Sequence, residues 1–188
     1  MAGVVLFHHA HGLTAGVLRF ADVFKAAGHT VYTPDLFEGQ VFDSLDDGVA
    51  YVDANFQDIL ARARKSVEPL PGNLVYAGFS LGSAAAQMLA QTRPGAKAAL
   101  LFHGAIPASE FGAWPERVAL EVHTAESDPW VDLGIARELV AGVQGAELFT
   151  YPGDRHLFAD ETLPDYDPHS AQLLTERALA FVSRRAPD

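Results

Sequence analysis

Six short apolar runs recur along the 188-residue chain, and they restrict its fold more than any other feature. The runs are GVVLFH (3–8), TVYTP (30–34), NLVYAG (73–78), AALLFH (98–103), RVALEVH (117–123) and AELFTYP (146–152). Each is nearly continuous in apolar residues, a pattern that is typical of strands covered on both faces. The runs therefore predict a mainly parallel sheet.

Helical periodicity fills several of the intervals between these runs. Apolar stripes at spacings of three and four residues occur within 17–24, 49–63 and 136–143. Near the end of the chain, Asp167 is expected to cap a last helix whose first residue is Pro168. This alternation predicts a single α/β domain over residues 1–188, with a six-stranded mainly parallel sheet flanked by helices on both faces.

The composition excludes several kinds of site and partner. The absence of cysteine excludes disulfides, thiolate metal sites and a cysteine nucleophile. Twenty-four acidic and 13 basic residues give a net charge of −11, which disfavours nucleic acid and anionic membranes as partners. The N-terminus lacks a basic region, and no apolar run reaches 18 residues, so a cytoplasmic protein is expected. No cofactor is expected, and homodimer formation is left open.

A serine between two glycines follows the third apolar run. Residues 78–82, GFSLG, match G-x-S-x-G, the nucleophile elbow, in which a tight strand-to-helix turn exposes the serine hydroxyl. The alternative is that Ser80 only caps the next helix, which is the commonest reason for a serine at a helix start. Capping does not require both Gly78 and Gly82. The small residues after Gly82 let that helix approach the sheet closely.

A serine nucleophile requires a base and an orienting acid, which follow this elbow in the order Asp or Glu, then His. After the fifth run, HTAESDPWVD offers Asp128, with Glu126 and Asp132 as rival acids. After the sixth run, YPGDRHLFAD offers His156 as the base. The carboxyl ends of parallel strands share one edge of a sheet, so we expect Ser80, Asp128 and His156 to meet there.

The same edge predicts the groups around these three. Oxyanion donors are expected from the N–H groups of Leu81, at a helix start, and Ala10, in the loop after the first run. Segment 35–47 is expected to lie over the site as a surface loop. The residues expected to line a substrate pocket are His9, His11, Phe37, Phe79, His103, Trp130, Phe158 and Asp160.

These motifs together resemble the dienelactone hydrolase family. The resemblance is carried by VVLFHHAHGLTAG, AAGHTVYTPDLFEG, YAGFSLGSAA, SDPWV and YPGDRHLFAD, which extend through nearly the whole chain. It implies a compact capless α/β-hydrolase that cleaves esters or lactones, and that begins at the third strand of the full sheet of that fold. In the roles that the resemblance implies, Ser80, Asp128 and His156 form the triad, and Ala10 and Leu81 supply the oxyanion donors.

The sequence departs from this family at three positions. Well-known members have a cysteine where Ser80 stands, a glutamate where His9 stands, and a substrate-binding arginine where Asp160 stands. A carboxylate at position 160 predicts that an anionic dienelactone is disfavoured.

Three other functions fit parts of the sequence. Imidazoles at strand ends could bind zinc, the candidates being His8, His9, His11 and His103. A non-catalytic binding protein could use the same scaffold, because a fold does not fix a function. A flavodoxin-like nucleotide binder is less well supported, because no glycine-rich phosphate loop follows the first run.

Overall fold

All six predicted strands are present in the computed structural model, which describes residues 1–185. They are β1 (Gly3–Phe7), β2 (Thr30–Tyr32), β3 (Leu74–Phe79), β4 (Ala98–Phe102), β5 (Ala119–Ala125) and β6 (Glu147–Tyr151). Every neighbouring pair is parallel, and the spatial order is β2-β1-β3-β4-β5-β6. The prediction of a six-stranded parallel sheet is confirmed.

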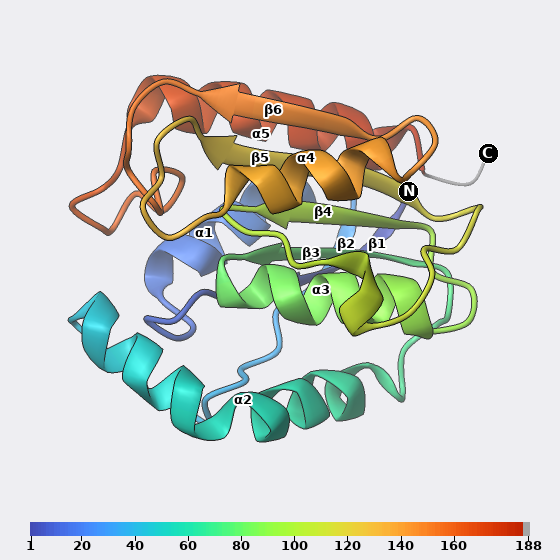
Figure 1. Ribbon diagram of the computed structural model, residues 1–188. Helices are drawn as coiled ribbons and strands as arrows, with labels where there is room; N and C mark the ends of the chain where they lie inside the picture. The colour runs from blue at the N-terminus through green and yellow to red at the C-terminus, as the bar shows by residue number, and fades with distance from the viewer. Residues whose placement is uncertain (186–188) are drawn as a thin grey trace.

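Five helices cover the two faces of this sheet. They are α1 (Ala15–Ala26), α2 (Leu45–Val67), α3 (Leu81–Thr92), α4 (Leu133–Ala141) and α5 (Pro168–Ser183), with a short 3-10 turn, η1 (Ala108–Glu110), after β4. Helices α1 and α5 lie on one face and α2, α3 and α4 on the other (Figure 1). Within residues 1–185, none of the helices combines the length and apolar character needed to cross a bilayer.

Each face of the sheet has its own apolar core. Phe20 and Phe24 of α1 pack with Phe181 of α5 against one face. Ile59 of α2 and Met88 of α3 belong to the core on the other face. Because both faces are covered, nearly all residues of the inner strands β1, β3, β4 and β5 are buried, which explains their continuous apolar runs, whereas the edge strands β2 and β6 are partly exposed.

Strand bounds differ from the predicted runs by one or two residues, and a following proline accounts for two of the ends. Strand β2 ends at Tyr32 although the apolar run continues to Pro34, and β6 ends at Tyr151, immediately before Pro152. Proline has no N–H with which to continue a ladder of hydrogen bonds. The predicted start of α5 is confirmed, because Pro168 is its first residue and the Asp167 side chain accepts a hydrogen bond from the Ser170 N–H.

The chain reverses its direction of travel across the sheet at β1. It passes from β1 to β2 on one side and then returns to β3 on the other side. The loops that leave the carboxyl ends of β1 and β3 therefore diverge, and such a point in a parallel sheet forms a crevice. Ser80 follows β3 there, and residues 8–14 follow β1.

Candidate active site

Ser80 has a strained backbone at the turn between β3 and α3. Its φ of 52° and ψ of −111° lie in a region that residues other than glycine rarely adopt. Its side chain forms no capping hydrogen bond with α3, so capping does not account for this serine. A Cβ on Gly78 would collide with the carbonyl of Gly82, and a Cβ on Gly82 would collide with the carbonyl of Phe7. Both glycines are therefore required by the turn.

Ser80, His156 and Asp128 form a continuous line of hydrogen bonds. The Ser80 hydroxyl lies 2.8 Å from Nε2 of His156, and Nδ1 of His156 lies 2.8 Å from Oδ2 of Asp128. A carboxylate only accepts, so Nδ1 carries the proton and Nε2 is free to accept from the hydroxyl. The backbone N–H of Trp130 donates a hydrogen bond to the other oxygen of Asp128, Oδ1, at 2.9 Å. This arrangement can withdraw a proton from Ser80.

The two rival acids lie elsewhere. Glu126 is exposed to solvent. Asp132 caps α4, because its side chain accepts hydrogen bonds from the N–H groups of Gly134 and Ile135. Of the three carboxylates in this loop, Asp128 is the one that contacts His156.

A second serine, Ser83, stabilises the turn that carries Ser80. Its hydroxyl lies 2.9 Å from the carbonyl oxygen of Gly78 and 2.8 Å from that of Phe102, and thus joins the ends of β3 and β4. In the sequence, Ser83 stands only as one of the small residues that follow Gly82. The single signal for this role is a serine three positions after Ser80.

The candidate oxyanion donors lie on the two sides of the crevice. Leu81 is the first residue of α3, and Ala10 lies in the loop that leaves β1. Within residues 1–185, neither N–H donates to a backbone carbonyl, as the role of oxyanion donor requires. The close approach of Gly82 to the carbonyl oxygens of Phe7 and His8 brings these two segments together.

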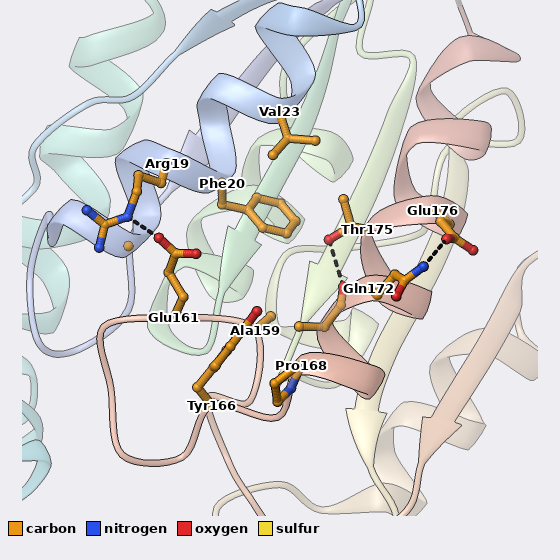
Figure 2. Close-up of a pocket in the computed structure, with 12 residues that line it drawn as sticks. Arg19, Phe20, Val23, Ala159, Glu161, Tyr166, Pro168, Gln172, Thr175 and Glu176 are labelled. Atoms are coloured by element: carbon orange, nitrogen blue, oxygen red, sulfur yellow. Dashed lines mark hydrogen bonds and ion pairs between the residues drawn. The ribbon is translucent and has the colours of Figure 1, made fainter.

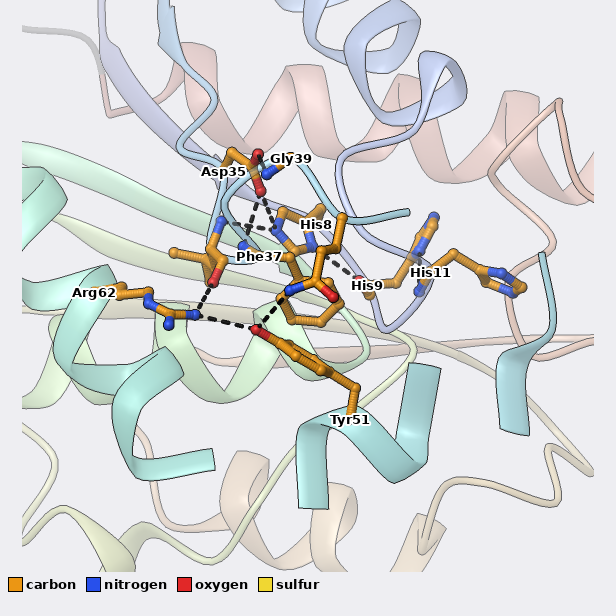
Figure 3. A network of polar contacts seen from close by, with 10 residues as sticks. His8, His9, His11, Asp35, Phe37, Gly39, Tyr51 and Arg62 are labelled. Atoms are coloured by element: carbon orange, nitrogen blue, oxygen red, sulfur yellow. Dashed lines mark hydrogen bonds and ion pairs between the residues drawn. The ribbon is translucent and has the colours of Figure 1, made fainter. Parts of the chain in front are cut away.

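His8 is a structural residue (Figure 3). Its Nε2 accepts the Leu36 N–H at 2.9 Å, and its Nδ1–H donates to the carbonyl oxygen of His9 at 2.8 Å. Burial lowers the pKa of His8 to about 4, so the ring is neutral at pH 7. Because both nitrogens are engaged, His8 has no lone pair to offer a metal ion.

Segment 35–47, which was expected to be a surface loop over the site, packs beside the β1–α1 loop, and its last residues begin α2. The Nδ1–H of His11 donates to the carbonyl oxygen of Phe42 at 2.7 Å, and the Phe42 N–H donates back to the carbonyl oxygen of His11 at 2.9 Å. Asp35 folds the segment on itself, since its carboxylate accepts the N–H groups of Phe37 and Gly39 (Figure 3).

His103 lies at the end of β4, next to the site. Its φ is 57°, and its ring packs against Phe158 and His156, with ring centroids 4.5 and 6.1 Å apart. Neither ring nitrogen has a hydrogen-bond partner within residues 1–185. Burial lowers its pKa well below the ordinary value, so the ring stays neutral. In that part of the chain, no three His, Asp or Glu side chains converge as metal ligands would.

The prediction that Asp160 lines the substrate pocket is wrong. Asp160 is only 3% exposed, and its oxygens accept hydrogen bonds from Nε2 of His9 (2.9 Å), the Thr14 hydroxyl (2.7 Å), and the N–H (2.8 Å) and hydroxyl (2.5 Å) of Thr162. Burial raises the pKa of Asp160, but these hydrogen bonds outweigh burial and hold the pKa well below its usual range. The carboxylate is therefore an internal anion.

Three aromatic residues expected in the pocket also lie in the core. Phe37 is fully buried in the core beneath α2, and Phe79 and Phe158 are buried in the core beneath α1 and α5. Trp130 differs from them, because it is 48% exposed and its ring centroid lies 6.1 Å from that of His156. Trp130 therefore stands at the rim of the site.

A cavity of about 420 Å³ opens between α1, α5 and the loop that precedes α5 (Figure 2). Phe20, Ala159 and Tyr166 form its apolar wall, and an Arg19–Glu161 ion pair lies at one side. Ser80, Asp128 and His156 do not belong to its lining.

Comparison with known proteins shows the family of this chain. The family model of the dienelactone hydrolase family matches residues 1–185. A protein named usf from Aquifex pyrophilus is 25% identical over 199 residues, which cover 95% of this chain and 86% of the relative.

Solved structures show the same fold. The dienelactone hydrolase-like promiscuous phosphotriesterase P91, from metagenomic libraries, superposes with a TM-score of 0.81 at 22% identity, over 98% of this chain and 86% of that one. A dienelactone hydrolase from Anabaena variabilis superposes with a TM-score of 0.66 at 19% identity, over 97% of this chain and 86% of that one. The match over residues 1–185 makes this chain a member of the dienelactone hydrolase family, and a hydrolase.

Proposed function

We propose that the protein is a serine hydrolase that cleaves a carboxylic ester or lactone through an acyl-enzyme. The observation that carries this proposal is the unbroken line from the Ser80 hydroxyl through His156 to Asp128, with both hydrogen bonds at 2.8 Å. The strained backbone of Ser80 supports it, because such strain persists where surrounding structure enforces it and is concentrated at functional sites.

In this mechanism, the Ser80 oxygen attacks the substrate carbonyl while Nε2 of His156 takes the hydroxyl proton. Asp128 stabilises the resulting imidazolium and remains ionised. The N–H groups of Ala10 and Leu81 bind the oxyanion, and His156 then gives its proton to the departing alkoxide. Water, deprotonated by His156, releases the acid and regenerates Ser80.

We propose a small ester or lactone with an uncharged acyl group as the substrate. Trp130 offers apolar contact at the rim of the site. Asp160, which the sequence suggested would repel an anionic substrate, has its charge compensated internally by four hydrogen bonds. A location in the cytoplasm belongs to the same proposal.

A serine-directed fluorophosphonate tests the nucleophile. The intact wild-type protein is expected to gain the mass of one adduct, and Ser80→Ala is expected to gain none. Ser66→Ala is the matched control, because the Ser66 hydroxyl donates to the carbonyl oxygen of Ala63 within α2 and its removal should leave labelling of Ser80 in place. An adduct that persists in Ser80→Ala contradicts the proposal.

A substrate panel then separates an enzyme from a binding protein on the same scaffold. We expect turnover of p-nitrophenyl acetate and of simple lactones by the wild type, and a loss of about 10⁶-fold in kcat in Ser80→Ala. An aryl phosphotriester belongs in the panel because P91 is described as a promiscuous phosphotriesterase. Background rates on every carboxylic ester and lactone would favour the binding protein.

A further inference from the structure

A second carboxylate and imidazole lie beside the first pair, outside the proposed triad. Asp160 contacts Nε2 of His9 at 2.9 Å, and both side chains are at most 2% exposed. Thr14 and Thr162 supply the other donors to this carboxylate. Gly16 makes room for it, because a Cβ at that position would collide with the Asp160 carboxylate. The pair joins the β1–α1 loop to the loop that carries His156.

The hydrogen bonds of His9 fix its orientation. Asp160 is an acceptor, so Nε2 of His9 carries the proton. Nδ1 is then unprotonated and accepts the backbone N–H of His11 at 3.3 Å. The opposite tautomer would place the Nδ1 proton against the His11 N–H. Asp160 therefore sets the imidazole, and the imidazole holds the backbone immediately after Ala10.

The Asp160–His9 pair resembles the Asp128–His156 pair of the proposed triad, but its imidazole contacts a different kind of group. Asp128 orients His156, which contacts a hydroxyl, whereas Asp160 orients His9, which contacts a backbone amide. Asp160 lies four residues after His156, and the Ala10 N–H lies one peptide before the amide that His9 holds. One carboxylate thus links the segment of the proposed base to the segment of the proposed oxyanion donor.

We propose that Asp160 and His9 are positioning residues that hold the Ala10 N–H where the oxyanion develops. This inference rests on the proposed function. An oxyanion donor acts more strongly on the transition state than on the bound substrate, so a displaced donor lowers kcat and leaves KM nearly unchanged. The affinity for an aryl boronic acid, whose tetrahedral adduct with Ser80 places an oxygen at the oxyanion position, should fall in parallel.

The test compares two neighbouring substitutions. Asp160→Asn is expected to lower kcat for p-nitrophenyl acetate by about 10- to 100-fold, and to weaken boronic acid binding by a similar factor, since loss of a whole donor costs about 10²- to 10³-fold. Glu161→Gln is the control, because the exposed Arg19–Glu161 pair joins α1 to the same loop without contacting His9 (Figure 2). It should leave both values unchanged.

A third variant keeps the test informative if Asp160→Asn does not fold. In His9→Gln, the side-chain amide can still donate to Asp160, but it offers no acceptor at the place of Nδ1 for the His11 N–H. We expect its kcat to fall as in Asp160→Asn, with KM unchanged. A wild-type kcat in His9→Gln, or a loss confined to KM, would overturn the inference. An inert wild type would instead contradict the proposed function, so the two failures are distinguishable.

Discussion

At the scale of single residues, Ser80 combines a reactive position with a costly conformation. Its φ of 52° lies in a region of backbone conformation that glycine adopts readily and residues with a Cβ adopt rarely. We therefore expect Ser80→Gly to be more stable than Ser80→Ala by about 1 kcal/mol, although both lack the hydroxyl. Urea unfolding of the two variants measures this difference.

The control is substitution of Asp53 by glycine and by alanine. Asp53 is exposed in the interior of α2, where alanine is favoured over glycine by up to about 1 kcal/mol, so the order of stability should reverse. If Ser80→Ala were the more stable of the two Ser80 variants, backbone strain at the elbow would be refuted.

The positions of the site loops were predictable from the sequence, whereas the directions of individual side chains were not. Strand order was sufficient to bring Ser80, Asp128 and His156 to one edge. It could not show that the chain turns between Leu157 and Asp160, where the Asp160 N–H bonds the Leu157 carbonyl oxygen and the carboxylate faces α1. For the same reason the His9–Asp160 contact, across 151 positions of sequence, left no signal.

At the scale of elements, the sequence predicted which segments form strands better than it predicted the residues at which those strands end. A strand covered on both faces is mainly apolar, so each of the six apolar runs predicted a strand. The ends depend on local hydrogen bonding, such as the ladder that stops before Pro152, and on register with a neighbour. Strand β3 extends to Phe79 because that residue pairs with Phe102 of β4.

The contact between α3 and β1 gives an element-scale prediction. Alanine normally stabilises a helix relative to glycine, but a Cβ on Gly82 would meet the carbonyl oxygens of Phe7 and His8. We expect Gly82→Ala to lower the free energy of unfolding by about 2 kcal/mol, because overpacking forces α3 away from the sheet. Urea unfolding gives the value.

Gly142→Ala provides the comparison for this prediction. Gly142 is the C-cap residue that follows α4, and its φ is −81°. A Cβ there would make only ordinary contacts of 3.5 Å. Its stability should rise by about 0.5 kcal/mol, through the smaller entropy of the unfolded chain. Equal effects at positions 82 and 142 would contradict the close packing of α3.

At the scale of the whole molecule, buried imidazoles make folding sensitive to acid. Burial lowers the pKa of His8, His9, His103 and His123, two of them at the end of β1 and two in or beside the strands on the other side of Ser80. In the unfolded chain each of these groups binds a proton near pH 6.5. Asp160, whose folded pKa is lowered, stabilises the fold above its ordinary value near 4, and that contribution is lost in stronger acid.

These shifts predict a loss of stability that begins well above the range of carboxylate titration. Below pH 6.5 the unfolded state binds more protons than the folded state, so the free energy of unfolding falls as the pH decreases. For His8, whose folded pKa is about 4, the loss accumulates between pH 6.5 and 4 and reaches about 3 kcal/mol. Urea unfolding at pH 7.5, 6 and 5 should show the decline, with a smaller slope in His8→Gln than in the wild type. The control is His169→Gln, on the exposed first turn of α5, which should keep the wild-type slope. A wild-type free energy of unfolding that does not change from pH 7.5 to 5 would show that folding does not hold these histidines neutral.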